Sequence, residues 1–217
     1  MKKKVLTKIG FLFDKSNLWI FDHFKKNNIE SKFRNKFKFL KSKELGKLSN
    51  CKIIFILGYT RIIEVSKLKK FRYALIVHES DLPKGKGFSP VKYQILENKN
   101  KIKVSLIECS KNFDSGDIFE QDHFFIKPTD IYEEIRKKQY LGTEKIINKF
   151  LKKYPNVKKR KQKGISTFYK KLTYKDDKID PKKSIISQFN LLRSTDYNRF
   201  PNYFYYKSQK FYIKIYK

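Results

Sequence analysis

The sequence predicts an α/β fold in which helices cover a mostly parallel sheet, followed by a short extension made of a helix and a β-hairpin. Three observations support this prediction. Short apolar runs recur at 52–57 and 73–78, as is typical of parallel strands that are buried on both faces. Helical patterns with recognisable start signals alternate with these runs. The end of the chain alternates around a polar turn, as a hairpin does.

The first half of the chain alternates strand and helix signals. Residues 5–13 form a short apolar run, and Ser16 and Asn17 can cap the helix that follows it. A later helix has a clear start, because Ser89 suits the N-cap and Pro90 suits the first helical position. These signals predict strand-to-helix units of the kind that build parallel sheets.

The second half begins with residues 101–108, where apolar and polar side chains alternate as in a half-buried strand. A helical pattern covers 129–153, and we expect this helix to close the main domain. Residues 157–164 are a charge run that ends in glycine. We interpret this run as a solvated linker rather than as a nucleic-acid patch.

The remaining residues predict a small subdomain. Asp180 and Pro181 form a second N-cap and first-position pair, ahead of apolar residues between 185 and 192. Residues 204–216 alternate around a polar turn and predict a terminal β-hairpin. The predicted units are a main domain over 1–155, a basic linker over 156–165 and a C-terminal helix and β-hairpin subdomain over 166–217.

The composition is strongly basic, with 52 Lys and Arg against 21 Asp and Glu and a formal net charge of +31. Such a charge attracts phosphate groups, so it permits a nucleic-acid partner. Only seven of the 52 cationic residues are arginines, however, and arginine is the residue that forks onto phosphate and guanine. We therefore interpret the lysine excess as compositional. It disfavours nucleic acid as the partner, yet it would still attract a phosphate-bearing substrate.

Cysteine usage and hydropathy predict a cytoplasmic protein. Cys51 and Cys109 lie beside apolar runs without metal-ligand or disulfide spacing, so we interpret them as buried free thiols. The basic start of the chain is followed by an apolar part that Lys8 interrupts, which does not fit a signal peptide. No apolar stretch has the length of a membrane span. We expect no membrane partner and no metal requirement.

Chemistry is expected where buried strands end in irregular loops. His78 ends the apolar run 73–78, and a loop dense in Pro, Gly and Lys follows it. Ligands of open α/β sheets bind beyond the carboxyl ends of the strands. The loop after 101–108 contains Asp114, which could orient and charge the imidazole as acid–base chemistry requires. Taken separately, each stretch also has an ordinary interpretation, as a loop-bonded His and as an Asp-Gly turn.

Together these loops resemble a known family. His-x-Ser-x-Leu-Pro from His78, then a basic glycine-containing loop, then Asp-x-Gly-Asp from Asp114, resembles the folate-dependent formyltransferases, which include the glycinamide ribonucleotide and methionyl-tRNA enzymes. Residues 58–63, Gly-Tyr-Thr-Arg-Ile-Ile, are similar to the segment that lines the pterin pocket of that family. Residues 75–90 are most similar to the branch that formylates 4-amino-4,6-dideoxy sugars on a nucleotide, including the pseudaminic-acid-pathway type. The segments that fit the same branch are 13–19, 189–193 and 199–201.

The resemblance implies a Rossmann-like formyltransferase fold and a one-carbon transfer. The donor would be N10-formyltetrahydrofolate, and the acceptor would be the primary amine of a UDP- or dTDP-linked 4-amino-4,6-dideoxy sugar. The product would serve surface polysaccharide biosynthesis, as in lipopolysaccharide O-antigen. By the same analogy the protein would form a homodimer through its C-terminal region.

Carried over position by position, the resemblance implies a set of site residues. His78 would be the catalytic imidazole and Asp114 its carboxylate partner. The implied cofactor-binding residues are Tyr59, Thr60, Arg61, Ile62, Ile63 and Phe113. The implied substrate-binding residues are Asp14, Lys15, Asn17, Trp19, Ser80, Lys84, Gly85, Lys86, Gly87 and Ser89. Trp19 and the two loop lysines also have ordinary interpretations, as a core aromatic and as solvated charges.

One position departs from the family pattern. The Asn that the family has two residues before its His is Ile76 here, and an isoleucine cannot donate a hydrogen bond to a developing oxyanion. Losing one such donor typically costs about 10²–10³ in rate. We expect another donor, such as a backbone amide of residues 84–87, to replace it.

Three alternatives stay open. A methionyl-tRNA formyltransferase would use the charge directly, but such enzymes resemble a longer chain with a separate C-terminal barrel. A basic nucleic-acid-binding protein would explain the charge but not the loops of His78 and Asp114. A catalytically impaired sugar-nucleotide binder would explain Ile76.

Overall fold

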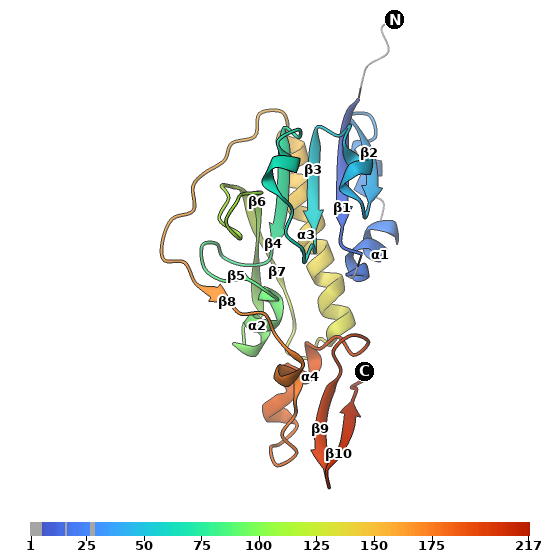
Figure 1. Cartoon of the computed structure of the whole chain (residues 1–217), viewed down its shortest axis with the longest axis vertical. Helices are drawn as coiled ribbons and strands as arrows, with labels where there is room; N and C mark the ends of the chain where they lie inside the picture. The colour runs from blue at the N-terminus through green and yellow to red at the C-terminus, as the bar shows by residue number, and fades with distance from the viewer. Residues whose placement is uncertain (1–5, 16, 27–28) are drawn as a thin grey trace, which may run out of the picture.

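The structure is a computed structural model that describes residues 6–15, 17–26 and 29–217. Its centre is a six-stranded sheet with the order β2-β1-β3-β4-β6-β7 (Figure 1). These strands are β1 (Thr7–Phe13), β2 (Phe37–Ser42), β3 (Ile53–Leu57), β4 (Tyr73–His78), β6 (Lys101–Glu108) and β7 (Ile118–Phe125). The first four strands in this order are parallel, β6 is antiparallel to β4, and β7 is antiparallel to β6. The expected mostly parallel α/β fold is confirmed.

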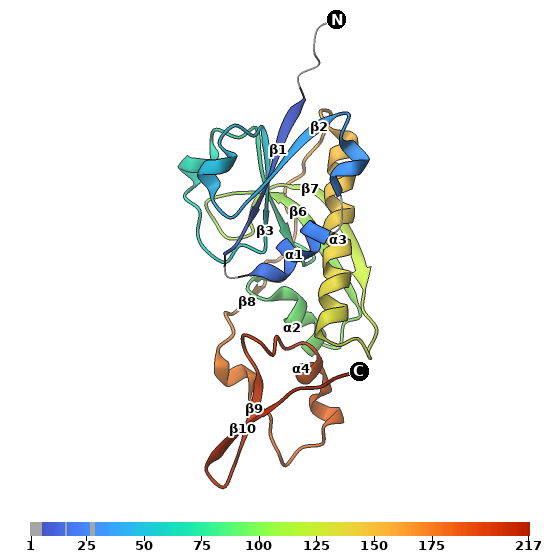
Figure 2. The ribbon, with the colours of Figure 1, turned by 90° about the vertical axis from the view of Figure 1, so that its right-hand side faces the viewer.

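Helices cover both faces of this sheet. The α-helices of the described residues are α1 (Leu18–Lys26), α2 (Pro90–Leu96), α3 (Tyr132–Lys153) and α4 (Phe189–Arg193). Short 3₁₀ helices are η1 (Ile29–Phe33), η2 (Leu45–Leu48), η3 (Val65–Leu68), η4 (Tyr174–Asp177) and η5 (Ile186–Gln188). Figure 2 shows α1 and α3 on one face and the segment with η2 and η3 on the other. Within the described ranges, no helix has the length and apolarity that a membrane crossing requires.

The parallel half of the sheet is packed on both sides, as its apolar runs predict. All five residues of β3 are buried. On the α1 and α3 face the packing is aromatic: the ring centroids of Phe11 and Phe24 lie 5.1 Å apart, and those of Phe55 and Phe150 lie 5.8 Å apart. On the opposite face, Leu68 of η3 joins the buried aliphatic side chains of β3. Burial of this apolar surface is the main force that holds the parallel strands in place.

One of the predicted helix starts is wrong in its capping group. Ser89 precedes α2, and Pro90 is the first helical residue as expected, but Ser89 has a φ of 48° and its hydroxyl makes no cap hydrogen bond. The predicted cap Ser16 lies outside the described residues. The side-chain amide of Asn17 donates to the carbonyl of Gly58 at 3.0 Å, and its Oδ1 accepts from Arg199 at 3.4 Å. The long helix α3 begins at residue 132, three residues later than its pattern suggests.

The helix predicted after Asp180 begins later than expected, at residue 186. The Asp180 carboxylate accepts a hydrogen bond from the Lys182 amide at 3.0 Å, which closes a local turn. The Gln188 side chain then donates to the Asp180 carbonyl at 3.0 Å and holds the intervening residues in turns. Ile186 is therefore 83% exposed instead of packing as a helical core residue. Helical structure follows only in η5 and α4.

The chain after α3 returns along the outer edge of the sheet (Figure 1). There β8 (Phe168–Tyr169) pairs in parallel with β5 (Lys86–Gly87). The chain continues to α4 and to the hairpin of β9 (Asn202–Tyr206) and β10 (Gln209–Ile213), which confirms the predicted hairpin. The division into units at 155/156 and 165/166 stays a proposal, and β8 joins the third of these units to the first.

Candidate active site

His78 and Asp114 are brought together from two different strands. His78 is the last residue of β4 and is 6% exposed. Its Nδ1 lies 3.6 Å from Oδ1 of Asp114, with 8% and 12% of the two side chains exposed. Because β6 is antiparallel to β4, with Leu75 opposite Glu108, the loop that carries Asp114 starts near the middle of β4 and has to fold back toward His78. The two residues therefore meet as expected, although not at two neighbouring carboxyl ends.

The turn that carries Asp114 is held through its side chain, its carbonyl and the nearby Gly116. Asp114 has a φ of +49°, in the left-handed region that few residues other than glycine adopt. Its Oδ2 accepts from the Gly87 amide at 2.9 Å, and its carbonyl accepts from Nε2 of Gln162 at 2.7 Å. At Gly116 an added Cβ would lie 1.7 Å from the Glu108 carbonyl oxygen, so only glycine allows this close return of the chain.

The second nitrogen of the His78 imidazole faces a carbonyl. Nε2 lies 2.8 Å from the Gly85 oxygen, and because a carbonyl only accepts, Nε2 carries a hydrogen. In the singly protonated ring, Nδ1 then turns a lone pair toward Asp114, and in the doubly protonated ring it turns an N–H toward it. Nδ1 is thus the nitrogen at which this imidazole can gain or lose a proton.

Residues 84–88, in the loop after β4, have no spare backbone donor. The amide hydrogens of residues 84–88 are donated, in chain order, to the Asp81 carbonyl, the Thr167 hydroxyl, the Thr167 carbonyl, the Asp114 carboxylate and the Tyr169 carbonyl. The expectation that one of these amides replaces the missing Asn as the oxyanion donor is therefore wrong. The reason is that acceptors in the same loop, in residues 167–169 and in the Asp114 turn already use them.

The two loop lysines differ in their surroundings. Lys84 is exposed, as a solvated charge is. Lys86 is 6% exposed, and its ammonium donates to the Ser115 hydroxyl at 2.9 Å, next to Asp114. Lys86 therefore places a buried positive charge beside the pair of His78 and Asp114. The sequence alone does not distinguish it from Lys84.

Ile76 places an apolar side chain on the same face of β4 as His78, two residues before it. It is partly buried and packs against the cluster of Leu82 and Ile107.

Cys109 is also partly buried at the edge of this region, and burial raises the pKa of its thiol to about 11, with the charges of Asp114 and Glu108 adding to the rise. The thiol is therefore protonated and unreactive at neutral pH.

The predicted cofactor segment, residues 59–63, is tied to β1. The Thr60 amide and hydroxyl both donate to Oδ2 of Asp14, at 2.8 and 2.7 Å. Asp14 is only 1% exposed, and its carboxylate holds this turn. Ile62 is 81% exposed and Phe113 is 58% exposed, which leaves apolar side chains open on the predicted donor side of the site.

The remaining predicted substrate residues are dispersed around the site. Lys15 and Ser89 are exposed. Trp19 is partly buried against the α1 and α3 core, with the guanidinium of Arg136 over its ring at 4.8 Å, so it serves packing as its ordinary interpretation expects. Ser80 is 2% exposed, and its buried hydroxyl has no hydrogen-bond partner among the described residues. Gly85 and Gly87 both have positive φ and lie against Tyr169 of β8.

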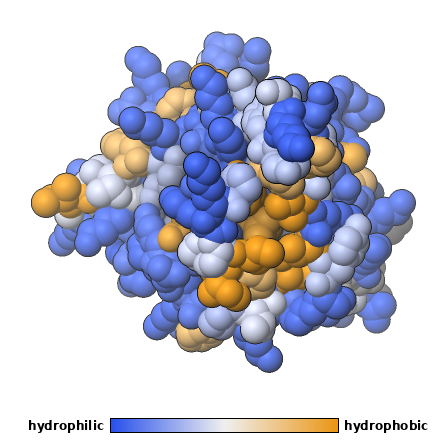
Figure 3. All heavy atoms as spheres, turned by 90° about the horizontal axis from the view of Figure 1, so that it is seen from below, coloured by the Kyte–Doolittle hydropathy of each residue, from blue (hydrophilic) through white to orange (hydrophobic). Residues whose placement is uncertain are grey.

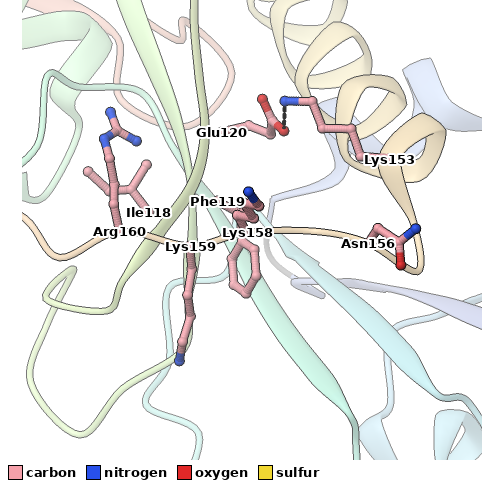
Figure 4. A pocket seen from close by; sticks show the side chains of 8 residues that line it. All are labelled: Ile118, Phe119, Glu120, Lys153, Asn156, Lys158, Lys159 and Arg160. Atoms are coloured by element: carbon pink, nitrogen blue, oxygen red, sulfur yellow. Dashed lines mark hydrogen bonds and ion pairs between the residues drawn. The ribbon is translucent and has the colours of Figure 1, made fainter.

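A pocket of about 350 Å³ lies elsewhere, between the start of β7 and the segment after α3 (Figure 4). In it the Lys153 ammonium is paired with Glu120 at 2.5 Å, and Arg160 and Lys159 border the opposite side. None of the site residues predicted from the sequence lines this pocket. The His78 and Asp114 pair therefore stays the better candidate for chemistry.

Comparison with known proteins places these features in context. The family described as formyl transferase matches residues 20–149. Methionyl-tRNA formyltransferase of Rickettsia massiliae is 31% identical over 134 residues, which cover 60% of this chain and 44% of that protein. The matched part thus spans less than half of that relative's length.

Solved structures match over almost the whole chain. Methionyl-tRNA formyltransferase from Clostridium thermocellum has a TM-score of 0.80 at 22% identity and covers 94% of this chain and 90% of that one. A sugar N-formyltransferase from a Shewanella species has a TM-score of 0.69 at 13% identity and covers 96% and 97%. HypX from Aquifex aeolicus in complex with tetrahydrofolic acid has a TM-score of 0.70 at 14% identity and covers 95% and 37%. At these identities the likeness shows the fold alone. The Clostridium chain is matched over 90% of its length, whereas the Rickettsia enzyme is matched over 44%.

Proposed function

This chain belongs to the formyl transferase family, and from that premise we propose that it transfers a formyl group from N10-formyltetrahydrofolate to the primary amine of a nucleotide-linked 4-amino-4,6-dideoxy sugar. The observation that carries the proposal is the nearly buried pair of His78 and Asp114, 3.6 Å apart at the end of a parallel strand. The donor is supported by the likeness to HypX with tetrahydrofolic acid. The acceptor class is supported by the Shewanella sugar N-formyltransferase, which matches over 97% of its length.

The proposed reaction needs one proton carrier. A bond forms between the acceptor nitrogen and the formyl carbon, the bond from that carbon to N10 breaks, and one proton passes from the acceptor amine to N10. The donor supplies the formyl carbon when bound. His78 carries the proton at Nδ1, since Nε2 is engaged with Gly85. The 3.6 Å separation from Asp114 is longer than a hydrogen bond, so Nδ1 is open to the amine while the carboxylate stabilises the imidazolium.

The residues present fit a planar donor with a largely apolar body. Phe113 and Phe88 are 58% and 38% exposed, and their ring centroids lie 6.4 Å apart beside the Asp114 loop. Residues 59–63 would hold the pterin from the other side, with Ile62 exposed toward solvent. Aromatic and aliphatic walls with a few polar groups are the usual lining of such sites.

Lys86 is the group that we assign to the missing oxyanion donor. The family Asn is Ile76 here, and the amides of residues 84–88 are already used. A buried ammonium next to Asp114 opposes negative charge that develops during transfer, and it does so more strongly than it would in water. We infer that this charge, rather than an amide, supports the reaction.

The proposal extends to assembly and location. We propose a UDP- or dTDP-linked acceptor, a cytoplasmic protein active in surface polysaccharide synthesis, and a homodimer through the C-terminal region. Figure 3 shows that end of the molecule, where apolar side chains gather within a mostly polar surface. In the C-terminal segment, Ile185, Ile186 and Phe211 are 67%, 83% and 46% exposed. Light scattering of the parent and of Ile186→Glu tests the dimer, and a parent that is monomeric at micromolar concentration contradicts it.

A second candidate acceptor is methionyl-tRNA. It is favoured by the TM-score of 0.80 to the Clostridium enzyme and by the net charge of +31, which suits a polyanion. The two acceptors differ in what they leave as product, so one assay separates them.

The deciding experiment offers both acceptors to the purified chain. The protein is incubated with formyltetrahydrofolate and either UDP- and dTDP-linked 4-amino sugars or methionyl-tRNA, and the gain of one formyl group is read by mass spectrometry. Formylation of a sugar at least about tenfold faster than of methionyl-tRNA supports the proposal. Formylation of methionyl-tRNA alone shows that methionyl-tRNA, and not the sugar, is the acceptor. Binding of a sugar nucleotide without any turnover identifies a catalytically impaired binder.

A further inference from the structure

The segment that follows α3 looks like a linker in sequence but is bonded to the site in structure. We call residues 158–169 the strap. The strap lies outside residues 20–149, which the family matches, and most of its side chains are exposed. In Figure 1 it runs down the outer edge of the sheet and reaches β5. Its hydrogen bonds connect it to the loop of Asp114 and to the loop that follows His78.

Gln162 bonds the strap to the Asp114 turn. Its Nε2 donates to the carbonyl of Asp114 at 2.7 Å and to the carbonyl of Gly116 at 2.9 Å, so both amide hydrogens are used. This matters because Asp114 has a φ of +49°, a conformation that persists only where surrounding contacts impose it. Gln162 is half-buried, whereas its neighbours Lys161 and Lys163 are exposed. The side chain that points inward is thus the uncharged one.

Thr167 bonds the strap to the His78 loop. Its hydroxyl accepts from the Gly85 amide at 2.8 Å, and its carbonyl accepts from the Lys86 amide at 2.9 Å. Gly85 in turn presents its carbonyl to Nε2 of His78 at 2.8 Å. Thr167 therefore sets the position of the peptide group that fixes the imidazole ring.

We propose that Gln162 and Thr167 are positioning residues, which hold Asp114 and His78 at their working separation from outside the matched family region. The proposal rests on the proposed function, because positioning has a purpose only if the pair performs chemistry. Neither residue has to touch a substrate. A displacement of about 1 Å at a reacting group can cost up to about 10²-fold in rate, so small shifts of the two loops are enough.

The first test removes the Gln162 bonds. Gln162→Ala is compared with Lys163→Ala, an exposed neighbour in the same charge run. We expect Gln162→Ala to lower kcat for formyl transfer about tenfold while KM for both substrates stays within about twofold, and Lys163→Ala to change neither. Parent-like kcat in Gln162→Ala overturns the positioning role of this residue.

The second test uses a conservative rescue at Thr167. Thr167→Val removes the hydroxyl that accepts from Gly85, and Thr167→Ser restores it. We expect about a tenfold loss of kcat in the valine variant and recovery in the serine variant, with the exposed Ser166→Ala as the control. Equal rates in the valine and serine variants overturn the proposal at this position. This pair also decides the matter if Gln162→Ala does not fold.

A readout without turnover separates this proposal from the proposed function. The Cε1–H resonance of His78, assigned by its loss in His78→Asn, is followed by NMR as a function of pH in the parent and variants. We expect the midpoint of the His78 titration to shift in Gln162→Ala and Thr167→Val, because Asp114 or the Gly85 carbonyl moves, while the His123 resonance titrates as in the parent. An unshifted midpoint in both variants contradicts the positioning role even if the parent enzyme is active. If the midpoint shifts in the variants but the parent is inactive, the positioning role of the strap is supported and only the proposed reaction is contradicted.

Discussion

Two histidine–aspartate pairs lie within the described part of this chain, and their surroundings differ more than their geometry. Nδ1 to Oδ1 is 3.6 Å in the pair of His78 and Asp114 and 3.7 Å in the pair of His123 and Asp122. The first pair joins two distant loops and is nearly buried, with side chains 8% and 12% exposed. The second joins neighbours on β7, and its imidazole is 37% exposed. Separation alone therefore does not identify a candidate catalytic pair.

The two carboxylates are used in different ways. Burial raises the pKa of Asp122, but hydrogen bonds from Lys149 and Lys145 outweigh this effect and bring it to about 2. Asp122 thus ties β7 to α3 through two lysines, at 2.6 and 3.0 Å. Asp114 accepts the amide of Gly87 from a distant loop and faces the imidazole of His78. Asp122 also accepts a backbone amide, that of His123, so the two lysines are what distinguishes it. A carboxylate that two lysines of α3 neutralise serves the fold, while Asp114 can orient a histidine.

The largest expected effect is at the first imidazole. His78→Asn removes the proton carrier, and we expect kcat/KM for formyl transfer to fall about 10³-fold, within the range of a positioned acid–base group. His123→Asn is the matched control, with an expected change of no more than about twofold. Initial rates by mass spectrometry of the formylated acceptor check both. Equal losses in the two variants would erase the distinction between the pairs.

The next effect is at the first carboxylate. Asp114→Asn keeps the size of the side chain and its bond from Gly87, but it removes the charge that stabilises the imidazolium. We expect kcat to fall about 10²-fold with little change in KM. Asp122→Asn should leave kcat unchanged. A kcat for Asp114→Asn within a few-fold of the parent contradicts the assigned role.

A smaller effect is expected from the buried lysine that accompanies only the first pair. Lys86→Met removes the ammonium next to Asp114. We expect kcat to fall about tenfold, because the negative charge that develops on the formyl oxygen during transfer loses a nearby positive charge. Lys163→Met, at an exposed position outside the site, is the control and should keep parent rates. Thermal melting of both variants checks that the fold is retained. Indistinguishable rates for the two variants would leave the oxyanion role without support from Lys86.

The smallest effect is on stability at the second pair. The pKa of Asp122 is lowered from 3.8 to about 2, so its stabilising contribution is present above pH 3.8 and is lost as the pH falls through 2. We expect the free energy of unfolding in urea at pH 7 to be about 1–2 kcal/mol lower in Asp122→Asn than in the parent. The effect is no larger because solvent screens part of the interaction at the exposed lysines. The difference from the parent should shrink below pH 4. A difference that is constant down to pH 2 would show that charge is not its source.

The sequence predicts the parts of the fold whose signals are local. The apolar runs at 53–57 and 73–78 become β3 and β4 because buried parallel strands need little else than continuous apolar side chains. No strand was assigned to 118–125, since its apolar residues gather at its two ends without alternation. It becomes β7 because β6 pairs with it and α3 covers it. Such tertiary effects are beyond a local pattern.

The candidate site was predictable to a similar extent. His78 and Asp114 belong to loops whose motifs are distinctive when taken together, so the sequence predicts both residues. Gln162 and Thr167 were missed because their bonds reach 48 and 82 residues along the chain and use a common amide and hydroxyl. The uncharged Gln162 within a run of lysines and arginines was the one local signal available. The occupied amides of residues 85, 86 and 88 likewise follow from the approach of residues 167–169 to β5, and strands of two residues give no local sequence signal for it.

The pairing of β8 with β5 also bears on how this chain could be recombined with others. A chimera joined at residue 155 would replace the donor of the Gln162 bonds and the acceptor at Thr167 together, and we expect such a hybrid to fold around its sheet yet carry a loosened histidine loop. A junction after residue 170 would keep these bonds and exchange η4, η5, α4 and the terminal hairpin. The C-terminal region could then be replaced without disturbing the loops that carry His78 and Asp114.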